Sequence, residues 1–251
     1  MGKVYLVGAG PGAPDLLTLR AARLLESADI VLHDALVHPD TLALAKRARF
    51  IDVGKRCGKV STDQRFINRA LIEAARTHEV VVRLKGGDPM LFGRAHEELE
   101  ALREAGIECE VVPGVTAALA AAATLQASLT RRGVARSVAF LTPRVGKGEG
   151  TSEWLPAALG ADSIVLYMAG GAAQSTAKSL IGAGKPSQTP VALVTSASLP
   201  EEVRVVTTLA ALAAQPLPQS TGPVVMAVGE VFRQRSALQE IEYAPQVASA
   251  R

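Results

Sequence analysis

The chain has 251 residues, of which 48% are hydrophobic and 20% are charged, and its formal net charge is +3. This composition excludes disorder as the main state, and an aromatic content of 4% disfavours single-stranded nucleic acid as a partner. The most apolar stretch, 115–129, is too short and too interrupted to span a membrane, and the first apolar run is too short for a signal peptide. We therefore expect a cytoplasmic protein.

Short runs of β-branched residues alternate with amphipathic stretches from one end of the chain to the other. The runs that predict strands lie at 3–7, 29–33, 49–53, 80–84, 108–112, 137–142, 163–168, 190–195, 202–207 and 223–228. Helices are predicted at 17–28, 62–78 and 93–106, where Thr18 suits the N-cap of the first and Gly106 ends the third. This alternation indicates an α/β protein with largely parallel sheets.

Two α/β domains are predicted from a change of texture along the chain. The first half has long connections rich in glycine and proline, whereas the second half is more compact and richer in alanine. We place the boundary within the "VVPGV" run at 111–115. The predicted domains are then 1–114 and 115–235, followed by a tail at 236–251.

The first strand is followed by the glycine-rich loop "GAGPGAPD" (8–15). Its two spaced glycines and Ala13 satisfy the G-x-G-x-x-[GA] pattern of a dinucleotide-binding fold. However, Pro11 and Pro14 remove backbone N–H donors that would face a pyrophosphate, and they delay the next helix. Asp34, at the end of the second strand, lies near the spacing of a ribose-binding acid. The loop alone leaves both NAD and another adenosyl cofactor open.

Two further loops follow strands in the first half of the chain. In "RLKGGDPMLFGR" (83–94), Gly86 and Gly87 allow a close approach to a ligand, and an Asp-Pro pair fixes a turn. In "VVPGVTAA" (111–118), a Pro-Gly turn precedes Thr116 at the expected start of a helix. A dinucleotide oxidoreductase needs neither loop, so together they favour a different cofactor.

Basic residues gather in three places, at 54–59, 131–136 and 144–147. A solvated surface is the ordinary interpretation of such clusters, and a funnel for a polyanionic ligand is the functional one. The two cysteines and four histidines have no metal-ligand spacing. We therefore predict reduced thiols and no metal.

Several segments, in this order, carry a resemblance to a known family: "VYLVGAGPGAPDLLTLRAARLLESADIVLHDALV", "VGKRCGK", "VVRLKGGDPMLFGR", "EELEALREAGIECEVVPGVTAA", "IVLYM", "PVALV" and "VGEVF". Together they resemble the tetrapyrrole (corrin/porphyrin) methylase family, and within it the branch that methylates uroporphyrinogen III on carbon. The similarity runs from about Lys3 to Phe232, and "RLKGGDP" is its most specific part.

The resemblance implies two α/β domains with an active-site cleft between them, a homodimer, and S-adenosylmethionine as methyl donor. Members of this branch methylate uroporphyrinogen III twice, on rings A and B, and give precorrin-2 for the siroheme, cobalamin or haem d1 routes. A family member acting on a later corrin precursor is the nearest alternative. A weakly active binder and an NAD-dependent oxidoreductase are two others, and the last rests only on the first loop and Asp34.

The resemblance also assigns roles to residues of this chain. The implied cofactor contacts are Pro11, Gly86, Gly87, Asp88, Leu91, Thr116, Ala117, Met168, Ala192 and Ala197. The implied polar groups for catalysis or substrate binding are Asp34, Lys55, Arg94 and Glu97. In-line methyl transfer needs positioning of the acceptor carbon and one nearby proton acceptor, and arginine suits the carboxylates of such a substrate.

Simpler interpretations of some of these residues stay open. Asp88 would also suit a plain turn, and Met168 the filling of a core. Arg94 would suit ordinary helix-surface pairs with Glu97 and Glu98. The chain departs from the family pattern at Ala13, Phe66, Ala95-His96, Pro143-Arg144 and Ala197-Ser198. These departures concern the substrate more than the methyl donor.

Overall fold

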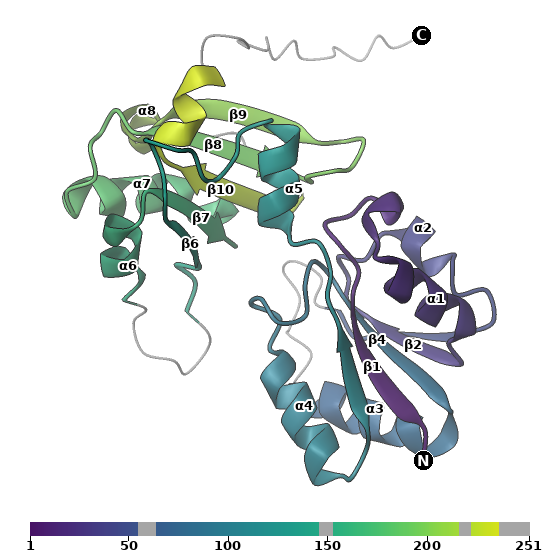
Figure 1. Cartoon of the computed structure of the whole chain (residues 1–251). Coiled ribbons are helices and arrows are strands. Elements are labelled where there is room, and N and C mark those ends of the chain that lie inside the picture. Colours follow the sequence, from purple (N-terminus) through teal and green to yellow (C-terminus); the bar gives the residue numbers. More distant parts are fainter. Residues whose placement is uncertain (55–63, 146–152, 216–221, 236–251) are drawn as a thin grey trace, which may run out of the picture. The chain divides into compact units, whose positions relative to one another are not determined.

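The computed structural model describes residues 1–54, 64–145, 153–215 and 222–235, and within them it has two five-stranded sheets (Figure 1). The strands are β1 (Lys3–Gly8), β2 (Ile30–His33), β3 (Arg49–Asp52), β4 (Val80–Lys85), β5 (Cys109–Val112), β6 (Val138–Leu141), β7 (Ser163–Tyr167), β8 (Pro190–Thr195), β9 (Val203–Thr208) and β10 (Val224–Val228). The helices are α1 (Leu19–Ser27), α2 (Pro39–Leu42), α3 (Gln64–Thr77), α4 (Ala95–Glu104), α5 (Ala117–Thr124), α6 (Trp154–Gly160), α7 (Ala173–Gly182) and α8 (Leu209–Ala214). All the predicted strands and the three predicted helices are confirmed.

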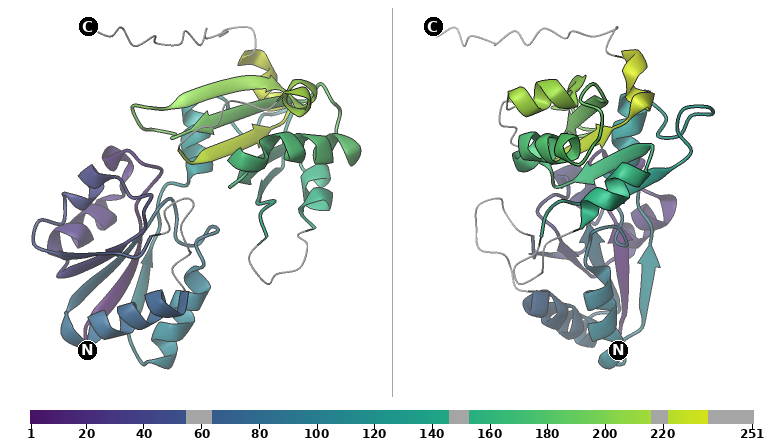
Figure 2. Two further views of the ribbon diagram at one scale, coloured as in Figure 1. Left: turned by 180° about the vertical axis from the view of Figure 1, so that it is seen from behind. Right: turned by 90° about the vertical axis from the view of Figure 1, so that its left-hand side faces the viewer.

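The first sheet is parallel throughout and has the strand order β3-β2-β4-β1-β5. Its central strands β1, β2 and β4 are largely buried because α3 and α4 lie on one face of the sheet and α1 packs on the other (Figures 1 and 2). The carboxyl ends of parallel strands meet at one edge of a sheet. The three glycine-rich loops of the sequence therefore begin at the same edge.

The start of α1 shows how the first loop delays its helix. Pro14 opens a short 3-10 segment, and α1 begins only at Leu19. The Thr18 side chain accepts a hydrogen bond from the Ala21 backbone N–H at 3.2 Å, as predicted for an N-cap. Ala21 and Leu25 then face the sheet and join its buried core.

The second sheet differs from the sequence-based prediction of largely parallel sheets. Its strand order is β6-β7-β10-β8-β9, and of its four pairings only β6 with β7 is parallel. That part of the prediction is wrong for a physical reason. The connection 196–202 between β8 and β9 is too short for the crossover helix that parallel neighbours require, so it forms a hairpin.

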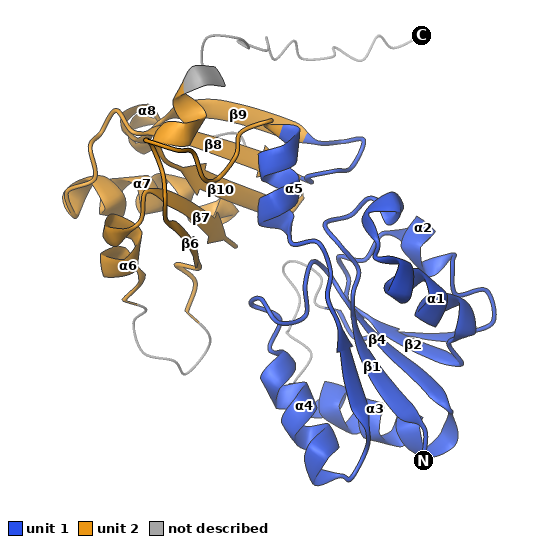
Figure 3. Ribbon diagram, viewed as in Figure 1, with its two compact units in different colours: residues 1–124, 196–202 blue, residues 125–195, 203–251 orange. Residues whose placement is uncertain are grey.

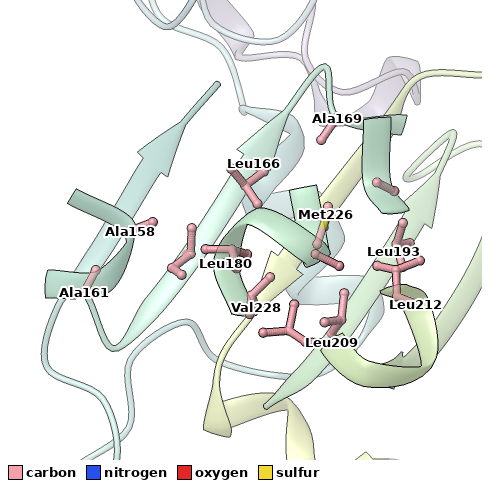
Figure 4. Close-up of a cluster of buried hydrophobic side chains, with 14 residues drawn as sticks. Ala158, Ala161, Leu166, Ala169, Leu180, Leu193, Leu209, Leu212, Met226 and Val228 are labelled. Carbon is pink, nitrogen blue, oxygen red and sulfur yellow. The ribbon is translucent and has the colours of Figure 1, made fainter. Parts of the chain in front are cut away.

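A second hydrophobic core lies under α7 and α8 on one face of this sheet (Figure 4). Leu166, Leu193 and Met226 come from three neighbouring strands, and Leu180 comes from α7. All four side chains are buried. Among the described residues, no helix is both long and apolar enough to cross a membrane.

The chain divides into two compact units (Figure 3). The first comprises residues 1–124 with 196–202, and the second comprises 125–195 with 203–251. The first unit thus includes α5 and the connection 196–202 between β8 and β9, whereas the predicted boundary at 114/115 precedes α5. The predicted tail, 236–251, lies outside the described residues.

Candidate functional site

The loops after β1, β4 and β5 meet at one edge of the first sheet. Gly10 and Gly87 form a two-way backbone bridge, in which the Gly87 N–H donates to the Gly10 carbonyl at 2.7 Å and the reverse bond is 3.2 Å. A Cβ atom on Gly8 would lie 2.6 Å from the Gly114 Cα and 2.7 Å from the Gly87 oxygen. Glycine at these positions is therefore what allows the three backbones to approach so closely.

Asp88 ties two of these loops together. Its Oδ1 accepts a hydrogen bond from the Met90 N–H at 2.8 Å, and its Oδ2 accepts one from the Gly114 N–H at 2.9 Å. The Leu91 N–H donates to the Asp88 carbonyl at 3.3 Å and completes the turn. Asp88 therefore forms a turn and also joins the second loop to the third.

The hairpin 196–202 brings a fourth segment to the first loop. The Ala13 N–H donates to the Ser198 Oγ at 3.1 Å, and the Ser198 N–H donates to the Glu202 carboxylate at 2.8 Å. Ser196 and Ser198 have φ values of +50° and +75°, which are uncommon for residues other than glycine. Ala197, between them, is buried. Backbone strain of this kind is concentrated at functional sites.

Arg94 occupies the N-cap position of α4 in the left-handed region, with φ +55° and ψ +27°. Its guanidinium makes a two-pronged ion pair with Glu97, with Nε–Oε1 at 2.6 Å and Nη2–Oε2 at 2.7 Å. The Arg94 side chain is 48% exposed, so the paired guanidinium stays accessible to a ligand. The pair matches both the surface interpretation and the one in which Glu97 orients Arg94. The strained backbone favours the second.

Asp34 follows β2 and belongs to a network of buried charges. Its Oδ1 accepts a hydrogen bond at 2.6 Å from Arg83 of β4, which is 2% exposed. Arg83 also donates through Nε to Glu98 of α4 at 3.0 Å, and Lys85 binds both oxygens of Glu98 at 3.0 and 2.9 Å. Gln64, at the start of α3, donates to the same carboxylate.

These surroundings shift the pKa values of the two buried bases. Burial alone would lower the pKa of the Arg83 guanidinium, but the nearby Asp34 and Glu98 carboxylates raise it above its ordinary value. Burial and the neighbouring Arg83 charge lower the pKa of Lys85, which Glu98 only partly offsets.

The remaining predicted residues are distributed as follows. Pro11, Gly86, Thr116 and Ala117 lie half-buried on the meeting loops or at the start of α5, in the first unit. Met168 and Ala192 belong to the second unit: Met168 follows β7, is 47% exposed and has φ +56°, whereas Ala192 is fully buried within β8. Lys55 lies outside the described residues.

The positions at which the chain departs from the family pattern also have distinct surroundings. Ala95 points into the first core, and His96 is exposed with its Nε2 at 3.9 Å from Glu97 Oε1. Phe66 is exposed on α3, and Arg144 is exposed after β6. The side chains of Ala95, His96, Phe66 and Arg144 make none of the described contacts between the three loops. Ser198, in contrast, accepts a hydrogen bond from the first loop through its Oγ.

Sequence reasoning missed Arg83 and Lys85. Its interpretation of Glu98 as a helix-surface partner of Arg94 is wrong, because Glu98 is fully buried and pairs with Arg83 and Lys85. One signal was available, because Arg83 and Lys85 alternate with Leu84 in a strand that is otherwise apolar, and alternate residues of a strand share a face. That pattern places two cations on the face covered by α3 and α4. A buried partner was therefore required, and α4 supplies it in Glu98.

The model of the family Tetrapyrrole (Corrin/Porphyrin) Methylases matches residues 3–213. The chain belongs to the tetrapyrrole methylase family. The resemblance that the sequence motifs indicate is thereby confirmed, as is the fold class of two α/β domains. Among the described residues, no group of three or more histidine, cysteine or acidic side chains could hold a metal ion.

Relatives of this tetrapyrrole methylase include the uroporphyrinogen-III C-methyltransferase of Synechocystis, which is 42% identical over 96% of this chain and 93% of that protein. The siroheme synthase of Azotobacter vinelandii is 44% identical, but this chain covers only 52% of it. Among solved structures, the uroporphyrin-III C-methyl transferase of Thermus thermophilus, complexed with S-adenyl homocysteine, has 42% identity and a TM-score of 0.82. That match covers 93% of this chain and all of the Thermus chain.

Proposed function

We propose that this chain is an S-adenosylmethionine-dependent C-methyltransferase that converts uroporphyrinogen III to precorrin-2 by two methylations. The observation that carries the proposal is the full-length similarity to the Synechocystis enzyme of that name, joined to the loop cluster at the edge of the first sheet. The similar Thermus structure, complexed with S-adenyl homocysteine, supports the choice of methyl donor.

The residues of the loop cluster fit an adenosyl cofactor. Gly8, Gly87 and Gly114 leave no side chain where the three loops approach one another, so backbone N–H and C=O groups are presented at the sheet edge. The resemblance assigns the cofactor to Pro11, Gly86, Gly87, Asp88, Leu91, Thr116, Ala117, Ala197, Met168 and Ala192. The first eight of these belong to the unit that contains the loop cluster. When bound, the cofactor supplies a methyl group on a positively charged sulfur.

The polar residues serve the tetrapyrrole. Arg94, oriented by Glu97, presents a guanidinium to a substrate carboxylate, for which its two parallel donors are well suited. Asp34 keeps a partly exposed carboxylate at the end of β2, where it can accept the proton that the cationic ring system gives up after a ring carbon is methylated. Lys55 is proposed as a further substrate contact from the family resemblance alone.

The oligomeric state, the cellular location and the use of the product are also proposals. The resemblance supports a homodimer in the cytoplasm and a product used for siroheme, cobalamin or haem d1. Light scattering of the purified chain tests the assembly: a mass of two chains is expected, and a monomer would contradict it.

A substrate comparison tests the proposed function. The purified chain is incubated anaerobically with labelled S-adenosylmethionine and either uroporphyrinogen III or a later corrin precursor. We expect label in uroporphyrinogen III and a product that carries two added methyl groups. Label only in the later precursor would instead support the sibling activity, which is suggested by 30% identity and a TM-score of 0.77 to a cobalt precorrin-4 methyltransferase. Tight binding of both ligands without any product would support a binder.

A further inference from the structure

The buried network around Arg83 is unusual for its place in the fold. Val81, Arg83 and Lys85 alternate along β4 toward the face that α3 and α4 cover, and their side chains enter a core lined by apolar residues. Burying two cations is unfavourable, and a buried ion pair is often no more stabilising than apolar residues of the same volume. The stability of the fold therefore gives no reason for the network.

The guanidinium of Arg83 is held on every side. Its Nε donates to Glu98 Oε1 at 3.0 Å, its Nη2 to Asp34 Oδ1 at 2.6 Å, and its Nη1 to the Leu84 carbonyl at 3.1 Å. Because the group is planar and all three sides are engaged, it has little freedom to rotate. It is thus a fixed donor aimed at one oxygen of Asp34.

Glu98 anchors the inner end of this arrangement. Its side chain is fully buried on α4 and accepts hydrogen bonds from Arg83, Lys85 and Gln64. At the outer end, Asp34 is 30% exposed and is the only carboxylate of this described network that solvent or a ligand can reach. The network therefore runs from a buried anchor to one accessible carboxylate at the edge where the loops meet.

We propose that Arg83 is a positioning residue that fixes the orientation of the Asp34 carboxylate for the reaction, and that Glu98 fixes Arg83. The inference rests on the proposed function for the role of Asp34. It requires nothing from Arg83 beyond holding that carboxylate, because Arg83 is itself too buried to touch a substrate.

A double-mutant cycle tests the proposal. Arg83→Lys keeps the charge but cannot span Asp34 and Glu98, so we expect kcat to fall roughly 10- to 150-fold while KM for S-adenosylmethionine changes little. In an Asp34→Asn background, the same substitution is expected to cause no further loss, because Arg83 acts through Asp34. Losses that multiply would overturn the proposal and leave Arg83 a structural residue. If Arg83→Lys does not fold, Arg83→Gln takes its place.

Lys185→Met is the control outside the network. Lys185 is a half-buried base of the second unit whose Nζ donates to the Ala161 carbonyl at 3.0 Å, and among the described contacts it makes none with Asp34, Arg83 or Glu98. We expect this variant to lose stability while its kcat stays close to that of the unmodified chain. A fall in kcat equal to that of Arg83→Lys would show that a general loss of stability lowers kcat, and would contradict a specific role for Arg83.

A crystal structure of Arg83→Lys separates this inference from the proposed function, because it needs no substrate. We expect the Asp34 carboxylate to leave its orientation in the unmodified chain. An unchanged carboxylate would overturn the positioning role even if uroporphyrinogen III is the substrate. If the unmodified chain methylates no tetrapyrrole, the proposed function fails, and the orientation of Asp34 still tests the positioning itself.

Discussion

At the scale of single residues, most of the described non-glycine residues with a positive φ lie in or beside the segments proposed to bind the ligands, with Gln126 as the exception. Arg94, Met168, Ser196 and Ser198 all have positive φ values without being glycine. Each such residue costs about 1–3 kcal/mol of folding free energy. Such a residue is therefore kept for what its side chain or its position does. For Arg94, we infer that the role is to present a guanidinium, oriented by Glu97, to a substrate carboxylate.

Substitutions of Arg94 separate its side chain from its backbone. Arg94→Ala removes a charge-assisted contact of about 1.5–3 kcal/mol, so kcat/KM is expected to fall roughly 10- to 150-fold. Arg94→Lys is expected to be impaired as well, because lysine lacks the two-pronged geometry. Binding of S-adenosylhomocysteine, measured by calorimetry, should stay normal in both. A kcat/KM equal to that of the unmodified chain in Arg94→Ala would restore the surface-pair interpretation.

Arg94→Gly adds a stability readout to the same position. Glycine adopts positive φ without strain, so this variant should unfold at a higher urea concentration than Arg94→Ala while losing as much activity. Equal midpoints for the two variants would show that the left-handed backbone stores no strain there.

At the scale of elements, the first sheet forms the candidate site by bringing the carboxyl ends of β1, β4 and β5 to one edge. The contact of Gly8 with Gly114 and Gly87 leaves no room for a methyl group, and all the neighbouring atoms are backbone. In the second unit, a side chain rather than a close backbone approach connects the segments before β6 and β7. The Asp162 carboxylate, just before β7, accepts hydrogen bonds from the Arg136 N–H and from the N–H and hydroxyl of Ser137.

Gly8→Ala tests the close approach of the loops. A Cβ at this position must displace backbone, so we expect a loss of about 1–3 kcal/mol in the free energy of unfolding and weaker binding of S-adenosylhomocysteine. Gly182→Ala, at the end of α7, is the control because its added methyl group meets nothing within 4 Å. Calorimetry should show normal binding for Gly182→Ala. Normal binding in Gly8→Ala as well would contradict a cofactor site at these loops.

Asp162 makes the stability of the second unit depend on pH. Hydrogen bonds from the Arg136 N–H and from Ser137 lower the pKa of Asp162 below its ordinary value of 3.8. Because the carboxyl of Asp162 has a lower pKa in the folded state than in the unfolded state, its ionisation stabilises the fold at pH values above the ordinary pKa. This contribution is lost as the pH falls through the lowered pKa of the folded state. Urea unfolding should therefore show Asp162→Asn as destabilised at pH 7, with the difference shrinking below about pH 4. A difference that does not change with pH would contradict this.

At the scale of the whole molecule, most of the architecture could be predicted from alternating strand and helix patterns and from turn residues. The pairing directions of the second sheet could not, because direction depends on how the chain returns, as the 196–202 hairpin shows. The close backbone approach at Gly86 and Gly87 and the turn at Asp88 could be predicted from the residue types. Arg83 and Glu98 could not be paired, since they meet only once α4 packs on β4.

We expect the loops at the edge of the first sheet to hold the methyl donor. A crystal structure of the chain with S-adenosylhomocysteine tests it most directly. We expect the ligand to contact the backbone of Gly86, Gly87 and Asp88 together with Pro11 and Thr116. A ligand bound elsewhere, or no bound ligand at a concentration that saturates the chain in calorimetry, would contradict it.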